Sequence, residues 1–118
     1  MSSDSLLALA ATIKARRIAA ADGSYTRQLL DAGVERCAKK FGEEAVETVI
    51  AATSQSKDAL AGEAADLLYH LLVLLECREV VLSDVFAKLE GRSGTSGLAE
   101  KAARDPAALA ARTPPAKP

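Results

Sequence analysis

The stretch EAADLLYHLLVLL, residues 63–75, combines an apolar helix pattern with two carboxylates in its first turn. Residues 67–75 are apolar apart from one tyrosine and one histidine, so apolar side chains cover the whole circumference of the predicted helix. Such a helix is buried or spans a membrane, and this one is shorter than the roughly 20 residues that a bilayer requires. We therefore expect it to be buried, by its own domain or by a second subunit, with Glu63 and Asp66 on one side of its entrance.

A second amphipathic helix is predicted immediately upstream, at about residues 34–52. Its apolar residues recur at intervals of three and four and share one face: Val34, Cys37, Ala38, Phe41, Ala45, Val49 and Ala52. Glu44 lies at the edge of this stripe, about 80° from its centre, and Glu47 follows three residues later. The intervening segment TSQSK, residues 53–57, predicts a short loop that makes the two helices an antiparallel hairpin.

This hairpin would bring four acidic residues together. Glu47 and Glu63 are equally distant from Gln55 at the centre of the loop, and so are Glu44 and Asp66. Two facing pairs of carboxylates in a poorly solvated place repel each other or take up protons unless a cation binds them. An all-oxygen ligand set favours Mg²⁺, or Mn²⁺, over Zn²⁺ and Cu²⁺. Because Mg²⁺ commonly completes its coordination with substrate phosphates, the pattern indicates phosphate-ester or anhydride chemistry.

Each of these features also has an ordinary structural interpretation. A single acidic pair on a helix is usually a solvated face, so the metal hypothesis depends on two pairs equidistant from one turn. For His70, a core histidine or one that hydrogen-bonds a carboxylate is the simpler interpretation. Lys39 and Lys40 are more often solvated than functional, although Lys40 lies one helical turn before Glu43 and Glu44, close enough to meet a phosphate there.

Composition narrows the functional classes. The 118 residues are 49% hydrophobic and 26% charged, which indicates one domain with enough apolar material for a core. A net charge of −1 and an aromatic content of two tyrosines and two phenylalanines argue against nucleic-acid binding. We find no signal peptide and no membrane-spanning run, and we expect a cytoplasmic protein. Cys37 and Cys77 are expected to be reduced thiols that act as small hydrophobic residues.

The remaining pattern is helical almost throughout, without an alternating strand pattern or an internal repeat. The hairpin's second helix is expected to begin at an Asp58 cap and to run to about Arg78. Further helices are expected at residues 5–17, capped by Asp4 or Ser5, within SYTRQLLDAG at 24–33, closed by Gly33, and at 83–92.

The predicted fold is an all-α helical bundle with a central antiparallel hairpin. We expect an all-α domain at residues 1–92, a segment at 93–104 that docks on it, and a disordered tail at 105–118.

The segments KKFGEEAVETVIAA, residues 39–52, and EAADLLYHLLVLL together resemble the phosphoribosyl-ATP pyrophosphatase family of histidine biosynthesis. The pattern EExxE followed by ExxD is shared with the wider all-α nucleoside-triphosphate pyrophosphatases, the MazG-like group, and does not select a substrate. The flanking segments GSYTRQLLDAG, LSDVFAKLEGR and SGLAEKAAR resemble the narrower family. The resemblance covers roughly residues 5–104.

This resemblance implies a magnesium-dependent hydrolase. It would cleave 1-(5-phosphoribosyl)-ATP between the α and β phosphates into 1-(5-phosphoribosyl)-AMP and pyrophosphate, the second step of histidine biosynthesis. Glu44, Glu47, Glu63 and Asp66 match the family's Mg²⁺ ligands, and the first two count among the catalytic residues. Glu43 would orient or deprotonate the attacking water. Whether one ion or two are bound stays open.

The resemblance also implies substrate contacts and assembly. The triphosphate would be bound by Lys39, Lys40 and Arg27. The phosphoribosyl group would contact Ser24, Tyr25 and Thr26, and the site would be closed over by Lys101 and Arg104. Members of the family pair to complete a larger bundle, so a homodimer or higher homo-oligomer is expected.

Three other functions fit parts of the pattern. A house-cleaning pyrophosphatase for non-standard nucleoside triphosphates would use the same acidic residues with another base pocket. A di-iron carboxylate protein would need two Glu-x-x-His motifs, and the chain has one histidine. A helical dimerisation module without enzymatic activity would carry the acidic residues only as surface groups.

Overall fold

The computed structural model describes residues 3–18 and 24–92 of the chain. Those residues form helices and connections, with no strand: α1 (Ser3–Ile18), α2 (Tyr25–Ala32), α3 (Val34–Ser54), α4 (Lys57–Cys77) and α5 (Leu82–Arg92). The all-α class is confirmed, and each expected helix is present within a few residues of its predicted bounds. Among the described helices, none combines the length and apolar character that a bilayer crossing needs.

The chain divides into two compact units, residues 1–82 and residues 83–118. Helices α1 to α4 belong to the first unit, and α5 from Ser83 onward belongs to the second. The predicted docked segment 93–104 and the predicted tail 105–118 lie outside the described residues. The domain bounds at 1–92 therefore stay a prediction.

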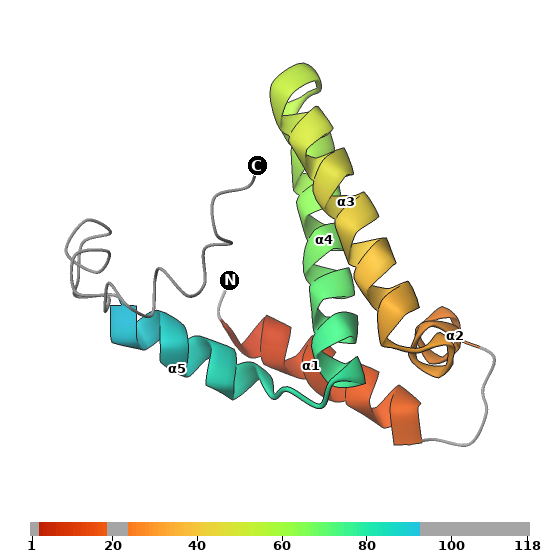
Figure 1. Ribbon diagram of the computed structural model, residues 1–118. Helices are drawn as coiled ribbons and strands as arrows, with labels where there is room; N and C mark the ends of the chain where they lie inside the picture. The colour runs from red at the N-terminus through yellow and green to blue at the C-terminus, as the bar shows by residue number, and fades with distance from the viewer. Residues whose placement is uncertain (1–2, 19–23, 93–118) are drawn as a thin grey trace, which may run out of the picture. The chain divides into compact units, whose positions relative to one another are not determined.

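Two long antiparallel helices, α3 and α4, form the predicted hairpin around Gln55 and Ser56 (Figure 1). The backbone of Ser56 is extended, and its hydroxyl oxygen accepts a hydrogen bond from the Ala59 N–H at 3.1 Å, which caps α4. The expectation that Asp58 caps this helix was wrong. Asp58 instead lies in the first turn of α4, where a negative charge suits the helix dipole.

The buried face of α3 also differs from the predicted apolar stripe. The buried residues of this helix are Cys37, Glu44 and Ala51, which are seven residues apart, as expected for the seam of a helix pair. Val49, which the pattern placed on the core face, is 61% exposed. Glu44, which the pattern placed at the edge, lies in the seam. A hydrophobic pattern does not distinguish a face buried within the chain from one available to another surface.

The hydrophobic core of the first unit lies where α1 and α2 pack against the hairpin. Every one of the four helices contributes to a buried cluster, whose members are Ile13, Leu29, Cys37, Leu72 and Val73. An ion pair between Arg17 and Glu76 joins α1 to α4. Figure 1 shows that the turn end of the hairpin extends away from α1 and α2. The core therefore lies at the base of the hairpin, and at the turn end α3 packs on α4.

Candidate metal centre

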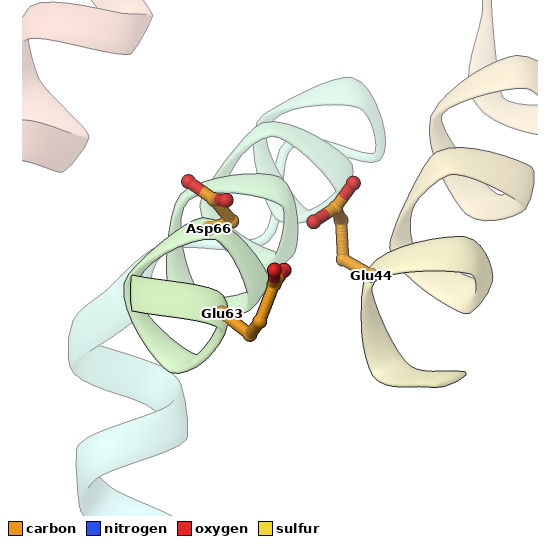
Figure 2. Close-up of side chains that lie close together, drawn as sticks. All are labelled: Glu44, Glu63 and Asp66. Atoms are coloured by element: carbon orange, nitrogen blue, oxygen red, sulfur yellow. The ribbon is translucent and has the colours of Figure 1, made fainter. Parts of the chain in front are cut away.

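Three carboxylates converge between the two helices of the hairpin (Figure 2). Glu44 from α3 and Glu63 and Asp66 from α4 each offer an oxygen within 4.8 Å of the other two. The hairpin register accounts for this convergence, since Glu44 and Asp66 are equally distant from the turn residue Gln55. The structure thus brings together three of the four acidic residues expected at the site.

A threonine fixes the relative height of the two helices at this point. The Thr48 hydroxyl donates a hydrogen bond to the backbone carbonyl of Glu44 at 2.8 Å and lies 3.3 Å from the backbone carbonyl of Glu63. Thr48 therefore links the backbones that carry two of the carboxylates. The spacing of the acidic residues does not point to Thr48, although its position one turn after Glu44 places it on the same face.

The electrostatics of Glu63 are unfavourable for a bare carboxylate. Its Oε1 atom is buried and has no hydrogen-bond partner among the described residues. Burial raises the pKa of Glu63, and the neighbouring charges of Glu47, Asp66 and Glu44 raise it further. Glu47 itself is exposed and borders the cluster beside Glu63.

These residues fit a hard divalent cation. The converging side chains offer only oxygen, as Mg²⁺ and Mn²⁺ prefer. A cation would give the orphaned Glu63 oxygen a partner and would offset the repulsion within the cluster.

Three aromatic side chains, Tyr25, Tyr69 and His70, form an aromatic group next to the carboxylates. His70 is buried in α4, as its simpler interpretation predicted, and burial is the main reason that its pKa is lowered. The ring of His70 lies edge-on to the rings of Tyr69, at 5.0 Å between centroids, and Tyr25, at 6.1 Å. Tyr25 is half-exposed and stacks on Tyr69 with centroids 6.5 Å apart. The sequence pattern assigned no role to Tyr69, the one tyrosine of the apolar stretch 67–75.

Lys40 and Glu43 form an ion pair at the edge of the site, with 3.3 Å between Nζ and Oε1. This hydrogen bond is the main reason that the pKa of Lys40 is raised, and the nearby Tyr25 and Glu44 add to the effect. Lys40 is therefore near both the aromatic group and the carboxylates. Lys39 is exposed.

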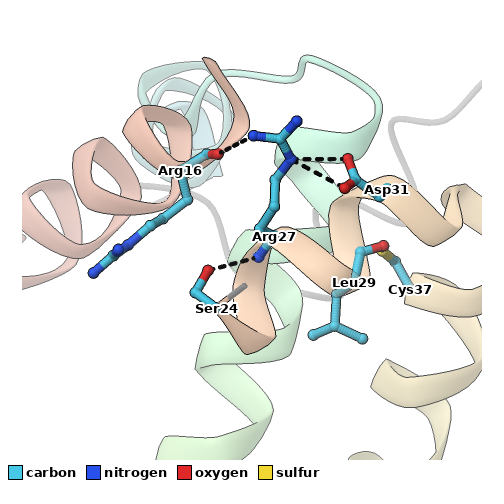
Figure 3. Close-up of polar contacts among 6 residues, drawn as sticks. All are labelled: Arg16, Ser24, Arg27, Leu29, Asp31 and Cys37. Atoms are coloured by element: carbon cyan, nitrogen blue, oxygen red, sulfur yellow. Dashed lines mark hydrogen bonds and ion pairs between the residues drawn. The ribbon is translucent and has the colours of Figure 1, made fainter. Parts of the chain in front are cut away.

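Two of the other residues expected to contact substrate, Ser24 and Arg27, form hydrogen bonds at α2 (Figure 3). Ser24 caps this helix by accepting a hydrogen bond from the Arg27 N–H at 3.0 Å. The Arg27 guanidinium pairs with Asp31, at 3.0 and 3.1 Å to the two carboxylate oxygens. The Thr26 hydroxyl is hydrogen-bonded to the Tyr69 hydroxyl. Lys101 and Arg104 lie outside the described residues.

Comparison with known proteins identifies the family. Residues 6–93, which include every residue of the acidic cluster, match the family described as phosphoribosyl-ATP pyrophosphohydrolase. The chain belongs to the phosphoribosyl-ATP pyrophosphohydrolase family. Curated relatives agree with this assignment. A phosphoribosyl-ATP pyrophosphatase of Agrobacterium fabrum is 59% identical over 104 residues, which are 88% of this chain and 97% of the relative.

Two further members of the family show the same extent of similarity. A phosphoribosyl-ATP pyrophosphatase 1 of Bradyrhizobium diazoefficiens is 60% identical over 96 residues, 81% of this chain and 91% of the relative. A phosphoribosyl-ATP pyrophosphatase of Jannaschia sp. is 59% identical over 96 residues, 81% and 94% of the two chains. The family resemblance stated from the sequence is confirmed, and the similarity covers nearly the full length of the relatives.

Proposed function

We propose that this chain hydrolyses 1-(5-phosphoribosyl)-ATP to 1-(5-phosphoribosyl)-AMP and pyrophosphate, as a step of histidine biosynthesis. The family assignment supports the substrate. The observation that carries the site is the convergence of Glu44, Glu63 and Asp66 on one small volume between α3 and α4. A triphosphate brings several negative charges, so a site made of carboxylates can receive it only if a cation lies between them.

The cation in this proposal is Mg²⁺, with Mn²⁺ as a substitute. Glu44, Glu63 and Asp66 hold it, and the adjacent Glu47 completes the acidic set. A bound Mg²⁺ neutralises charge on the phosphates and lowers the pKa of coordinated water. The orphaned oxygen of Glu63 supports this assignment because a buried acceptor without a donor is costly unless a cation is bound.

The chain's own residues bind the phosphates and activate the water. Lys40 lies between the aromatic group and the carboxylates, so its ammonium can exchange the Glu43 carboxylate for a phosphate oxygen. Glu43, released from that ion pair, accepts the proton of the attacking water. Tyr25 offers a half-exposed ring and a hydroxyl beside Lys40, and in this proposal it contacts the phosphoribosyl group.

The same proposal includes a homodimer. Val46, Val49 and Ile50 form an apolar stripe on α3, at spacings of three and four residues, and each is about half exposed or more. A second copy of the chain would cover this α3 stripe and extend the bundle where α1 and α2 do not reach. The expected pairing of family members supports this choice of partner.

The test of the proposed activity is pyrophosphate release from phosphoribosyl-ATP, with Mg²⁺ and with a chelator. We expect activity only with Mg²⁺, and we expect kcat/KM to fall by roughly 100-fold or more in Glu63→Gln and in Glu47→Gln. Glu35→Gln, which changes an exposed carboxylate in the first turn of the same α3, is the matched control and should keep full activity. Circular dichroism would show that each variant is folded.

A panel of deoxynucleoside triphosphates and non-standard nucleoside triphosphates separates the two enzymatic hypotheses. Preference for a member of that panel over phosphoribosyl-ATP would favour the house-cleaning function. Full activity of Glu63→Gln with the chelator present would contradict the metal centre.

A further inference from the structure

Two cysteines that are 40 residues apart in the sequence meet at the base of the hairpin. Cys37, near the start of α3, and Cys77, the last residue of α4, have their sulfur atoms 3.1 Å apart. This separation is only about 1 Å longer than a disulfide bond of about 2.05 Å. Both cysteines are free thiols in this structure. A movement of about 1 Å would bring the two sulfur atoms to bonding distance.

The two thiols differ in their surroundings. Cys37 is 1% exposed, belongs to the hydrophobic core, and donates a hydrogen bond to the Leu29 carbonyl at 3.2 Å (Figure 3). Cys77 lies at the border of that core and is partly exposed. Burial, together with the hydrogen bond to Cys77, raises the pKa of Cys37 to about 12. A reagent from solution therefore meets Cys77 first, and Cys37 is placed to react with whatever forms there.

We propose that Cys37 and Cys77 are a redox modification site at which a peroxide converts the two thiols into an intrachain disulfide between α3 and α4. The two free, adjacent thiols are the observation that carries this proposal. It is independent of the proposed catalytic activity. The α3–α4 disulfide would close a loop that contains the whole acidic cluster and the hairpin turn.

The chemistry proceeds in two steps. The Cys77 thiolate attacks one peroxide oxygen, the O–O bond breaks, and hydroxide leaves, which gives a sulfenic acid on Cys77. The Cys37 sulfur then attacks the Cys77 sulfur, the S–O bond breaks, and water leaves with the proton of Cys37. With hydrogen peroxide, two thiols and one peroxide give one disulfide and two waters.

The experiment treats the purified full chain with hydrogen peroxide, unfolds it in denaturant so that the buried Cys37 becomes accessible, blocks the remaining thiols by alkylation, and measures the intact mass. We expect a monomeric chain that has lost two hydrogens, resists alkylation at both cysteines, and regains two alkylation sites after treatment with dithiothreitol. Its Tm should rise by roughly 10 °C, because the bond constrains a loop of about 40 residues in the unfolded state. Loss of the thiol donor to Leu29 offsets part of this gain.

Cys77→Ser and Cys37→Ser are the matched variants. The serine at position 37 keeps a donor for the Leu29 carbonyl, and neither variant should show the peroxide-dependent rise in Tm. The mass of the native chain decides the question even if a variant fails to fold. A disulfide between two chains, or oxidation of Cys77 to a sulfinic acid with Cys37 still open to alkylation, would overturn the proposal.

Discussion

Gly33 shows how one residue sets a junction between two helices. The backbone there has φ of 99° and ψ of 174°, a combination found essentially only at glycine. Its N–H bonds to the Leu30 carbonyl at 3.3 Å, and its own carbonyl accepts a hydrogen bond from the Cys37 N–H at 3.1 Å. A Cβ at this position would meet no atom within 4 Å. The cost of any other residue is therefore confined to the backbone conformation.

Replacing Gly33 by alanine should lower the free energy of unfolding by about 1–3 kcal/mol, because alanine is strained at this φ and ψ. Urea denaturation measures the change. Gly62→Ala is the matched control, since Gly62 lies inside α4 and also has open space around its Cβ position. That substitution should stabilise by roughly 0.5–1 kcal/mol through helix propensity. Equal effects at the two glycines would contradict the interpretation.

Glu63 carries a pH dependence that follows from its surroundings. Its pKa is raised above the ordinary 4.5, first by burial and then by the charges of Glu47, Asp66 and Glu44. The folded state therefore holds this proton more tightly than the unfolded state. The associated stability is fully present below about pH 4.5 and is lost as the pH rises through the raised pKa.

With a chelator present, Tm of the native chain should consequently fall relative to Tm of Glu63→Gln as the pH is raised above about 4.5. Thermal melts of both proteins across this range give the difference directly. Glu35→Gln, which removes an exposed carboxylate outside the cluster, is measured alongside as the control for the loss of one charge. A difference that grows in the opposite direction would rule out repulsion at Glu63.

Addition of Mg²⁺ at neutral pH should reverse this loss. At about 100 times Kd, binding to the folded state alone contributes about 2.7 kcal/mol. The stabilisation should be seen in the native chain and in Glu35→Gln and should be small in Glu63→Gln. Thermal melts with and without chelator provide the measurement, and equal stabilisation of all three proteins would place the ion elsewhere.

At the scale of elements, the α3–α4 hairpin is positioned by its turn and by one cross-helix contact. Ser56 starts α4 by capping it, and Gln55 ends α3 with its N–H on the Ala51 carbonyl at 3.1 Å. Thr48 lies close to backbone carbonyls of both helices. The turn sets which residues face each other, and Thr48 holds that register beside the carboxylates.

Ser56→Ala should lower the free energy of unfolding by about 1 kcal/mol, because the Ala59 N–H loses its acceptor. Asp58→Ala, two residues later, removes only a favourable interaction with the helix dipole and should cost roughly 0.3 kcal/mol. Chemical denaturation of the two variants side by side distinguishes a cap at Ser56 from the cap that the sequence suggested. A larger effect at Asp58 would restore the original prediction.

In the whole molecule, the acidic cluster and the exposed apolar α3 stripe lie on the same part of the hairpin. The core cluster lies at the base with α1 and α2, whereas the acidic cluster and the α3 stripe of Val46, Val49 and Ile50 are carried by α3 and α4. Exposed apolar residues at helical spacing favour an interaction surface. The proposed homodimer accounts for this arrangement.

Val49→Asp should therefore shift the chain from dimer to monomer, because a carboxylate in a desolvated apolar interface is strongly unfavourable. Size-exclusion chromatography with light scattering measures the mass of the assembly. Val81→Asp, a valine with 50% exposure in the connection between α4 and α5, is the matched control and should leave the dimer intact. A native chain that is monomeric at all concentrations would contradict the assembly.

Local features of the sequence were enough to predict the helices, the hairpin and the acidic cluster. Helical periodicity, Gly33 and the loop around Gln55 are local features, and the antiparallel register follows from counting residues away from one turn. Glu44, Glu63 and Asp66 could be placed together for that reason.

Which side of each helix is buried, and what each polar side chain contacts, depends on how the helices pack together. Glu44 lies in the seam between α3 and α4, and Val49 is exposed. Ser24 and Thr26 form hydrogen bonds within the fold, and Cys37 lies beside Cys77. These outcomes depend on helix rotation and on the packing of α1 and α2 against the base of the hairpin. Neither is encoded in the spacing of residues along one helix, because several rotations bury similar amounts of apolar surface.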